Sequence, residues 1–449
     1  MTGLAVVLAA AGFSLVHANA ASAQTPTSLT LAPPFDQNPV GTPHTVTASV
    51  TCFFGLFFGP CPGGVPVNFT VTGANNTGGT RFTNSAGQAM FTYTGTFVGF
   101  DTIRAFAGSA TGPPATKQWL VGPPRSVKLS PPADTNPVGT THTVTATVRD
   151  QFNNPTPGVV VQFSVTGANP RPPTPVVTNS AGQANFTYVG TMAGMDTITA
   201  SVAGCCTAQA TKTWLAGPPR SVTLSPLTDT NPVDTQHCVT ATVRDQFGNP
   251  VQGVRVRFSV TGSVMTSGSA VTGPTGQAQF CYMGPALPGA DVINAYADTD
   301  NDNVQDLGEP SAQPATKTWV LPVTTPGCEI KITNGGWIIA MNGDRASFGG
   351  NAKADEDGNV TGQEEYQDHG PATPFNLHGN VLVVVCNSAT SATIFGEATI
   401  DGSGSHTYRI DVQDNAEPGK GADHYRMRVN AYDSGDQVLE GGNVQIHQD

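Results

Sequence analysis

Charged residues are scarce in this chain of 449 residues. Asp, Glu, Lys and Arg together make up 12% of it, against roughly 25% in an average soluble protein. The hydrophobic content of 38% is too high for a disordered chain. No basic patch with interleaved aromatics occurs, and the formal net charge of −12 repels phosphate backbones. The composition therefore argues against both disorder and nucleic-acid binding.

Long apolar runs are absent after Gln24, where nothing approaches the roughly 18 residues that a membrane helix needs. The run before it, from Leu4 to Val16, is followed by Ala21-Ser22-Ala23, which has the form of a signal peptidase site. We therefore expect residues 1–23 to be a signal peptide and the mature chain to be exported, with no transmembrane segment.

Familiar catalytic and zinc-binding motifs are also missing. The sequence has no G-x-S-x-G, no H-E-x-x-H and no phosphate loop, and its cysteines never stand in Cys-x-x-Cys spacing. These absences favour a protein that is not an enzyme.

Glycine and proline, by contrast, are plentiful, with 51 and 36 residues. This balance predicts many short strands joined by turns, in an all-β protein. Residues 1–320 hold 14 acids and 13 bases, whereas residues 321–449 hold 18 acids and 7 bases. We therefore expect a separate acidic domain from residue 321 onward.

Three internal repeats fill the chain before that boundary. Asp134-Thr135-Asn136-Pro137-Val138 recurs at residues 229–233 and, more loosely, at 36–40. Each copy continues with a strand that begins at a His, a Phe-x-Val-Thr-Gly strand, a Gly-Gln-Ala turn and a Trp. The period near 95 residues is the size of an Ig domain. The expected repeats are residues 24–122, 123–217 and 218–320.

Within a repeat the hydrophobic period is two. Val144, Ala146 and Val148 alternate with polar residues, as in a strand that faces a core on one side. The His before them recurs in all three copies, which cannot together form one site, so we interpret it as structural.

The pattern from Asn231 to Val254, with Arg-Asp-Gln-Phe-Gly-Asn-Pro-Val inside it, then Gly-Gln-Ala and Gly-x-Asp-x-Ile-x-Ala from Gly289 to Ala295, resembles bacterial Ig-like domain 1, the repeat of invasin and intimin. The resemblance implies three tandem sandwiches of seven strands, A to G, in a bacterial protein that is secreted or on the cell surface. Repeat 1 departs from the pattern at Thr51-Cys52-Phe53-Phe54.

Eight cysteines in an exported chain predict disulfides. Cys238 and Cys281 replace threonines of the other copies together, so we expect a bond between them, across strands B and E at the surface. Cys328 and Cys386 remain to pair in the last domain, and Cys52 and Cys61 flank one loop. Cys205 and Cys206 are adjacent, where a bond is sterically awkward, so free thiols or intermolecular pairing remain open.

The loop between Cys52 and Cys61 is unusually aromatic. Either its side chains form an exposed contact site for a partner, or they fold back to fill the core. The residues concerned are Phe53, Phe54, Leu56, Phe57 and Phe58.

Repeat 3 carries an insertion with the spacing of a calcium loop. Acids stand at positions 1, 3, 5, 9 and 12 of twelve residues, and position 7 offers a backbone carbonyl. Asn303 takes the place of the usual glycine and tolerates a left-handed turn. We expect calcium as the cofactor, stiffening the junction with repeat 2, with ligands from Asp298, Asp300, Asp302, Val304, Asp306 and Glu309.

Residues 328–449 alternate in short strands, which predicts a small β-barrel or β-sandwich. Segments 343–352, 366–370, 414–419 and 441–447 resemble the post-COAP-type domain of secreted bacterial proteins. Glu364 and Glu365 are adjacent and face opposite sides of a strand, so they cannot form a glycosidase pair. Asp368, His369 and His378 are interpreted as structural rather than catalytic.

These observations favour a non-enzymatic stalk or adhesin whose partner is an extracellular or cell-surface protein or glycan. The alternative is a carbohydrate-binding protein or hydrolase with its site in the last domain.

Overall fold

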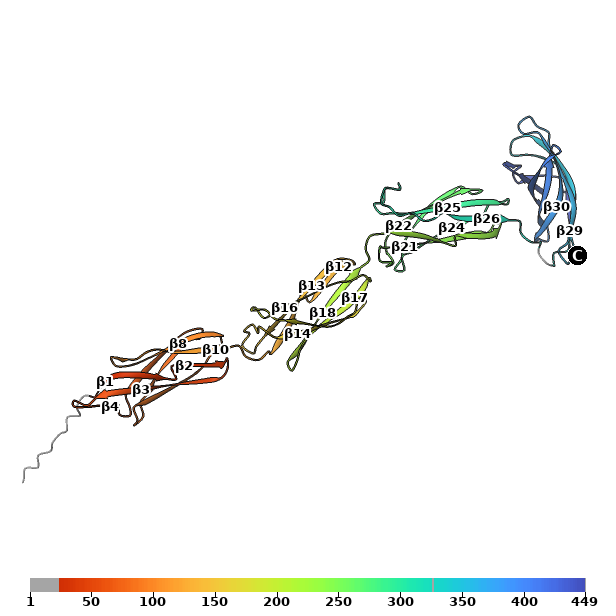
Figure 1. The fold of residues 1–449 in the computed structure, drawn as a ribbon. Helices are drawn as coiled ribbons and strands as arrows, with labels where there is room; N and C mark the ends of the chain where they lie inside the picture. The colour runs from red at the N-terminus through yellow and green to blue at the C-terminus, as the bar shows by residue number, and fades with distance from the viewer. Residues whose placement is uncertain (1–23, 325–326, 449) are drawn as a thin grey trace, which may run out of the picture. The chain divides into compact units, whose positions relative to one another are not determined.

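The computed structural model describes residues 24–324 and 327–448, and in these ranges every regular element is a β-strand (Figure 1). The all-β prediction is confirmed. The expected signal peptide, residues 1–23, lies outside the described residues. The chain divides between Leu215 and Ala216 into two compact units.

Repeat 1 is a sandwich of two sheets. One contains β1, β3, β4 and β7, and the other has the order β2-β10-β8-β5-β6 with β9 beside β8. The strands are β1 (Thr25–Ala32), β2 (Phe35–Pro39), β3 (Pro43–Phe53), β4 (Phe58–Pro60), β5 (Pro66–Gly73), β6 (Thr77–Phe82), β7 (Gln88–Thr94), β8 (Gly99–Ala107), β9 (Ala110–Thr111) and β10 (Ala115–Leu120).

Repeat 2 has the same two sheets, in the orders β11-β13-β16 and β12-β18-β17-β14-β15. Its strands are β11 (Ser126–Ser130), β12 (Ala133–Pro137), β13 (Thr141–Arg149), β14 (Val160–Gly167), β15 (Arg171–Val177), β16 (Gln183–Val189), β17 (Gly194–Val202) and β18 (Cys206–Leu215).

Repeat 3 repeats the arrangement as β19-β21-β24 and β20-β26-β25-β22-β23. Its strands are β19 (Ser221–Ser225), β20 (Thr228–Pro232), β21 (Gln236–Arg244), β22 (Arg255–Gly262), β23 (Thr266–Val271), β24 (Gln277–Met283), β25 (Gly289–Asp298) and β26 (Ala315–Val320).

The alternation seen in the sequence builds the core of each repeat. Val144, Ala146 and Val148 on β13 are fully buried, and the residues between them are partly exposed. Trp214 packs edge-on against Tyr188, and the same Trp–Tyr pair occurs in the other repeats. The first strand of the larger sheet pairs with the last in parallel, whereas its other pairs are antiparallel.

The last domain is one antiparallel sheet of ten strands around a single core. Its strands are β27 (Ile330–Ile339), β28 (Arg345–Ala354), β29 (Val360–Asp368), β30 (Phe375–Ser388), β31 (Ser391–Ile400), β32 (Ser403–Gln413), β33 (His424–Val429), β34 (Tyr432–Asp433), β35 (Gln437–Val438) and β36 (Gly441–Gln448).

Gly335 and Gly336 lie inside one continuous strand, β27. The neighbouring backbone is so close to Gly336 that a side chain would not fit there. A Cβ on Gly336 would lie 2.3 Å from the carbonyl oxygen of Gly441 on β36.

The structure joins Cys238 to Cys281 and Cys328 to Cys386. Cys238 and Cys281 stand directly opposite each other on β21 and β24, on the outer face of that sheet. The other repeats have a Thr–Thr hydrogen bond at this place, of 2.7 Å in repeat 1 and 2.9 Å in repeat 2. The disulfide thus replaces a hydrogen-bonded pair.

Cys205 and Cys206 are also joined, at the turn before β18. The expectation of free or intermolecular thiols is therefore not met. The turn, residues 203–205, contains Gly204, which has a φ of +70°. A residue without a side chain allows this left-handed conformation.

Candidate functional site

The acidic loop of repeat 3 connects β25 to β26 and begins on the sheet itself. Asp298 is the last residue of β25, pairs with Arg255 of β22 and is 1% exposed. The first predicted ligand is therefore held by a strand, while residues 299–308 are exposed and Glu309 is half-buried.

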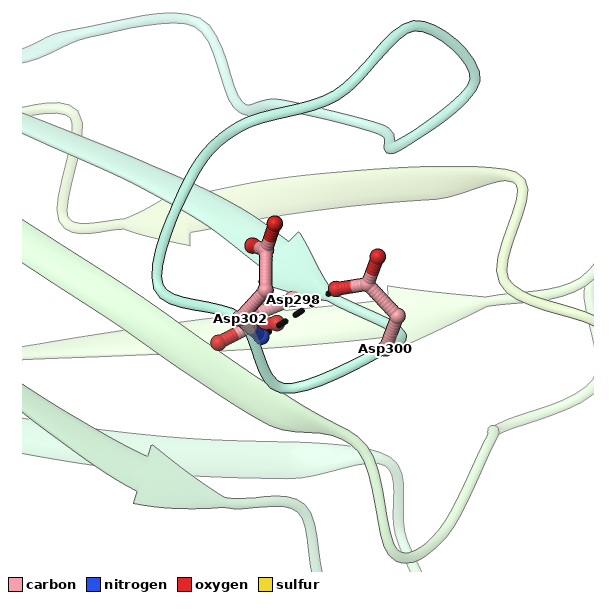
Figure 2. A group of neighbouring side chains, drawn as sticks. All are labelled: Asp298, Asp300 and Asp302. Atoms are coloured by element: carbon pink, nitrogen blue, oxygen red, sulfur yellow. Dashed lines mark hydrogen bonds between the residues drawn. The ribbon is translucent and has the colours of Figure 1, made fainter.

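Three carboxylates of this loop gather at one place (Figure 2). The potential ligand oxygens of Asp298, Asp300 and Asp302 all lie within 4.8 Å of one another. The amide of Asp302 donates to Asp300 at 3.2 Å, and the amide of Val304 donates to Asp302 at 2.7 Å. Asn303 has a φ of +71°, the left-handed turn expected at this position.

The buried carboxylate of Asp298 is only half satisfied. Its Oδ2 accepts from Arg257 Nε at 2.7 Å, and its Oδ1 is buried and makes no hydrogen bond of standard geometry among the described residues. Burial would raise the pKa of this carboxyl, but Arg257 and the nearby backbone amides of Asn301 and Asn303 lower it. A buried polar oxygen without a partner costs about 1–3 kcal/mol. An oxygen of this kind beside two more carboxylates fits the ligand set of a hard cation.

The remaining acids of the loop, Asp306 and Glu309, lie close enough to the other carboxylates to be repelled by them. The charge of Asp302 is the main cause of the raised pKa of Asp306. Glu309 accepts from the amides of Thr299, at 2.5 Å, and Asp306, at 3.2 Å, so its carboxylate closes the loop. Of the six predicted ligands, the structure brings three together and leaves Asp306 and Glu309 beside them; Val304 is exposed.

The aromatic loop of repeat 1 is a hairpin between β3 and β4. Cys52 and Cys61 are bonded and fully buried, so the hairpin is fixed to the core. Phe54 packs on the core, whereas Leu56 is 96%, Phe57 62% and Phe58 67% exposed. Phe53 is also exposed. Both readings therefore apply in part: one ring folds back and four side chains face the solvent.

A buried polar network recurs in every repeat. Asp101 accepts from Trp119 Nε1 at 2.7 Å and from the Tyr93 hydroxyl at 3.2 Å. Burial, followed by the charge of Asp101, raises the pKa of Tyr93. The recurring His lies in the core, where His44 Nδ1 is 2.9 Å from Asp36, and burial lowers its pKa. These contacts support a structural role for the histidine.

The same network contains a lysine that was not predicted from the sequence. Lys117 is fully buried and donates to Asp36 at 2.6 Å. The sequence did carry a signal, because an Ala-Thr-Lys-x-Trp segment recurs in all three repeats.

In the last domain, Glu364 points into the core and Glu365 is exposed, as their adjacency predicts. Asn334 Nδ2 donates to both oxygens of Glu364, at 3.0 and 3.1 Å. Burial raises the pKa of Glu364 to about 7. Gly350 leaves the room for it, since a Cβ there would lie 2.2 Å from Glu364 Oε2.

His369 and His378 lie at the surface. His369 Nε2 is 2.7 Å from Ser347 Oγ, and His378 Nδ1 is 3.3 Å from Glu365. Among the described residues no carboxylate bonds to the other ring nitrogen of His369, as an acid–base triad would require. Asp368 is buried and accepts from the Tyr432 hydroxyl at 2.8 Å.

Residues 138–214 match the family model described as bacterial Ig-like domain (group 1). Repeat 2 is a bacterial Ig-like domain of group 1. The other two repeats have the same sheet orders and the same Trp–Tyr pair, so the chain contains three Ig-like domains in tandem. The resemblance of residues 328–449 to the post-COAP type remains a prediction.

A curated relative of these Ig-like domains is the inverse autotransporter adhesin YeeJ of Escherichia coli K12. It is 30% identical over 254 residues, which cover 52% of this chain and 11% of the adhesin. The chain thus spans about a tenth of that relative's length.

Two solved structures match this chain over most of their own length. The Escherichia coli adhesin FdeC has 20% identity and a TM-score of 0.37, covering 67% of this chain and 99% of its own. Invasin, described as a bacterial integrin-binding protein, has 15% identity and a TM-score of 0.39, covering 88% of this chain and 82% of its own. Among the described residues, no helix is long and apolar enough to cross a membrane.

Proposed function

We propose that this chain is a non-enzymatic, secreted or cell-surface adhesin of a bacterium, in which the Ig-like domains form the stalk. The observation that carries the proposal is the 30% identity to an adhesin over 254 residues. The tandem domains support it, since repeated modules of this kind suit projection from a surface. Its partner is an extracellular or cell-surface protein or glycan.

Within this function, the loop of repeat 3 binds calcium and stiffens that repeat. The buried, unpaired Oδ1 of Asp298 and the adjacent carboxylates of Asp300 and Asp302 support the site. A divalent cation supplies the positive charge that would neutralise the repulsion between Asp302 and Asp306. The hydrogen bond from Arg257 on β22 to Asp298 holds the start of the loop to the sheet.

A binding and turnover experiment separates the adhesin from a hydrolase. The mature chain is applied to an array of glycans and extracellular proteins, and the same panel is analysed for cleavage. An adhesin retains at least one ligand without turnover. Cleavage that is lost in a Ser347→Ala variant would instead establish a hydrolase at the Ser347–His369 pair.

A further inference from the structure

Each repeat buries one lysine between the first and last strands of its larger sheet. Lys117, Lys212 and Lys317 are each 0% exposed. Lysine is almost never fully buried unless it is paired. In all three repeats the lysine stands directly opposite an aspartate on the parallel neighbouring strand. An arrangement that recurs three times in one chain is a built feature of the fold.

In repeat 1 the amine meets two polar side chains of β2. Lys117 Nζ donates to Asp36 Oδ2 at 2.6 Å and also to Asn38 Oδ1. Asn38 follows Asp36 by two residues, so both side chains point to the same face of the strand. The ring of Trp119 lies 4.9 Å from Nζ. The amine is thus enclosed with one carboxylate and one carboxamide.

Repeat 2 has the same set on β12 and β18. Lys212 Nζ donates to Asp134 Oδ2 at 2.7 Å and to Asn136 Oδ1, and the ring of Trp214 lies 4.7 Å away. Repeat 3 has the same residue types in the same register, and Lys317 donates to Asp229 at 2.7 Å.

An amine, a carboxamide and a carboxylate in contact are the groups needed to form an amide bond without any cofactor. We propose that Lys117 is joined to Asn38, and Lys212 to Asn136, by a covalent bond between lysine Nζ and asparagine Cγ. The neighbouring aspartate carries the proton in each case. The proposal does not depend on what the chain adheres to.

The reaction balances with the groups present. The aspartate carboxylate takes a proton from Nζ, and the free amine attacks Cγ of the asparagine. The Nζ–Cγ bond forms and the Cγ–Nδ2 bond breaks. Nδ2 leaves as ammonia and carries the surplus lysine proton away as ammonium, so the aspartate is regenerated. Nothing is oxidised or reduced.

Burial assists this reaction because it keeps competing water from the site. The histidine of the same network holds the aspartate in place, with His44 Nδ1 at 2.9 Å from Asp36 Oδ2 and His142 Nδ1 at 3.0 Å from Asp134 Oδ2. The bond would tie the first strand of the larger sheet to the last, across a separation of 79 residues in repeat 1 and 76 in repeat 2. Tension along the chain would then bypass most of repeat 1 and of repeat 2.

Tryptic peptide mapping of the reduced mature protein tests the proposal directly. A linked Lys117 is not cleaved, so peptide 24–81 should appear joined to peptide 105–125. In repeat 2, peptide 129–149 should appear joined to 150–220. Each pair should weigh about 17 Da less than its two parts, the mass of the lost ammonia. Separate peptides with cleavage after Lys117 and Lys212 would overturn the proposal.

The same map distinguishes the acceptor. A joined pair lighter by about 18 Da, the mass of water, would place the bond on Asp36 and overturn the asparagine assignment. The Asp36→Asn variant should lose the link in repeat 1 and keep it in repeat 2, which serves as the internal control. Lys117→Met tests the same loss with the buried stem preserved. Full linkage in Asp36→Asn would contradict the role of the aspartate.

Discussion

Glu364 is the buried acid whose charge is least compensated in the last domain. Its oxygens accept from Asn334, and the hydroxyls of Tyr408 and Tyr425 in the same core have no partner among the described residues. Burial dominates over the hydrogen bonds, which is why the pKa rises to about 7 from the usual 4.5 of a glutamate. The residue is thus protonated in the folded domain under mildly acidic conditions.

The stability of the last domain should therefore fall as the pH rises. Between pH 4.5 and 7 the folded state holds the Glu364 proton and the unfolded chain does not, so the favourable contribution present at low pH disappears through this range. The full loss is roughly 3 kcal/mol. Denaturant unfolding from pH 4.5 to 8 measures it. Glu364→Gln should remove most of this pH dependence, because glutamine does not titrate. The variant should remain folded, since Asn334 Oδ1 is free to accept from the new amide. An unchanged slope would contradict the assignment, and the exposed Glu365→Gln is the control.

The disulfide of repeat 3 replaces a threonine pair, so its contribution can be measured by restoring that pair. Closing 43 residues stabilises by about 4 kcal/mol in the chain-entropy model, and the returning hydrogen bond contributes about 1 kcal/mol. The double variant Cys238→Thr with Cys281→Thr should lower the unfolding free energy of repeat 3 by about 3 kcal/mol. Equal stability of variant and parent in thermal unfolding would show that the bond is strained.

The connection between the last two strands is the element that varies most between the repeats. In repeat 1 it is the short β9 turn, in repeat 2 it holds the Cys205–Cys206 pair, and in repeat 3 it is the acidic loop. The flanking strands keep the same pairing throughout. The cysteine pair and the acidic cluster thus lie on a loop, while the pairing of the flanking strands stays constant.

Calcium should bind the acidic loop in the millimolar range. Extracellular calcium modules bind at roughly 0.1 to 1 mM. At about 2 mM calcium and an affinity of about 0.1 mM, binding stabilises the folded form by about 1.8 kcal/mol. Calorimetry of the mature chain should show heat that Asp300→Ala and Glu309→Ala remove, while the exposed Glu356→Ala retains it. No heat at millimolar calcium in the parent would refute the site. Binding without any change in hydrogen exchange of repeat 3 would refute the stiffening.

In the aromatic hairpin, Phe54 should contribute to the stability of repeat 1, whereas Leu56 and Phe57 should not. Phe54→Ser should lower the melting temperature of repeat 1 by several degrees, since its ring packs on the core. Leu56→Ser and Phe57→Ser should change it little because both side chains are exposed. Thermal unfolding followed by circular dichroism checks this. A large fall for Leu56→Ser would show that the tip is packed after all.

Much of the fold could be predicted because strand alternation and the three copies are local signals. The Cys238–Cys281 bond followed from two substitutions that occur together. Other features depend on contacts distant in sequence. The pairing of Lys117 with Asp36 requires the parallel register of β2 and β10. The single strand through Gly335 and Gly336 requires the approach of β36.

At the scale of the whole molecule, three Ig-like domains, the second of which matches the group 1 family, precede an acidic domain of ten strands. Each Ig-like domain has its own pair of sheets and its own buried lysine network. The exposed, uncharged hairpin of repeat 1 is the proposed contact with a partner.

Attachment under flow tests the adhesive function most directly. Beads that carry the mature chain through its C-terminus are passed over surfaces bearing the ligands retained on the array. Beads with the parent chain should stay attached, and those with Phe57→Ser and Phe58→Ser should detach at lower shear. Phe82→Ser, which alters another exposed phenylalanine of repeat 1, should behave like the parent. Parent beads that attach no better than beads coated with an inert protein would contradict the account.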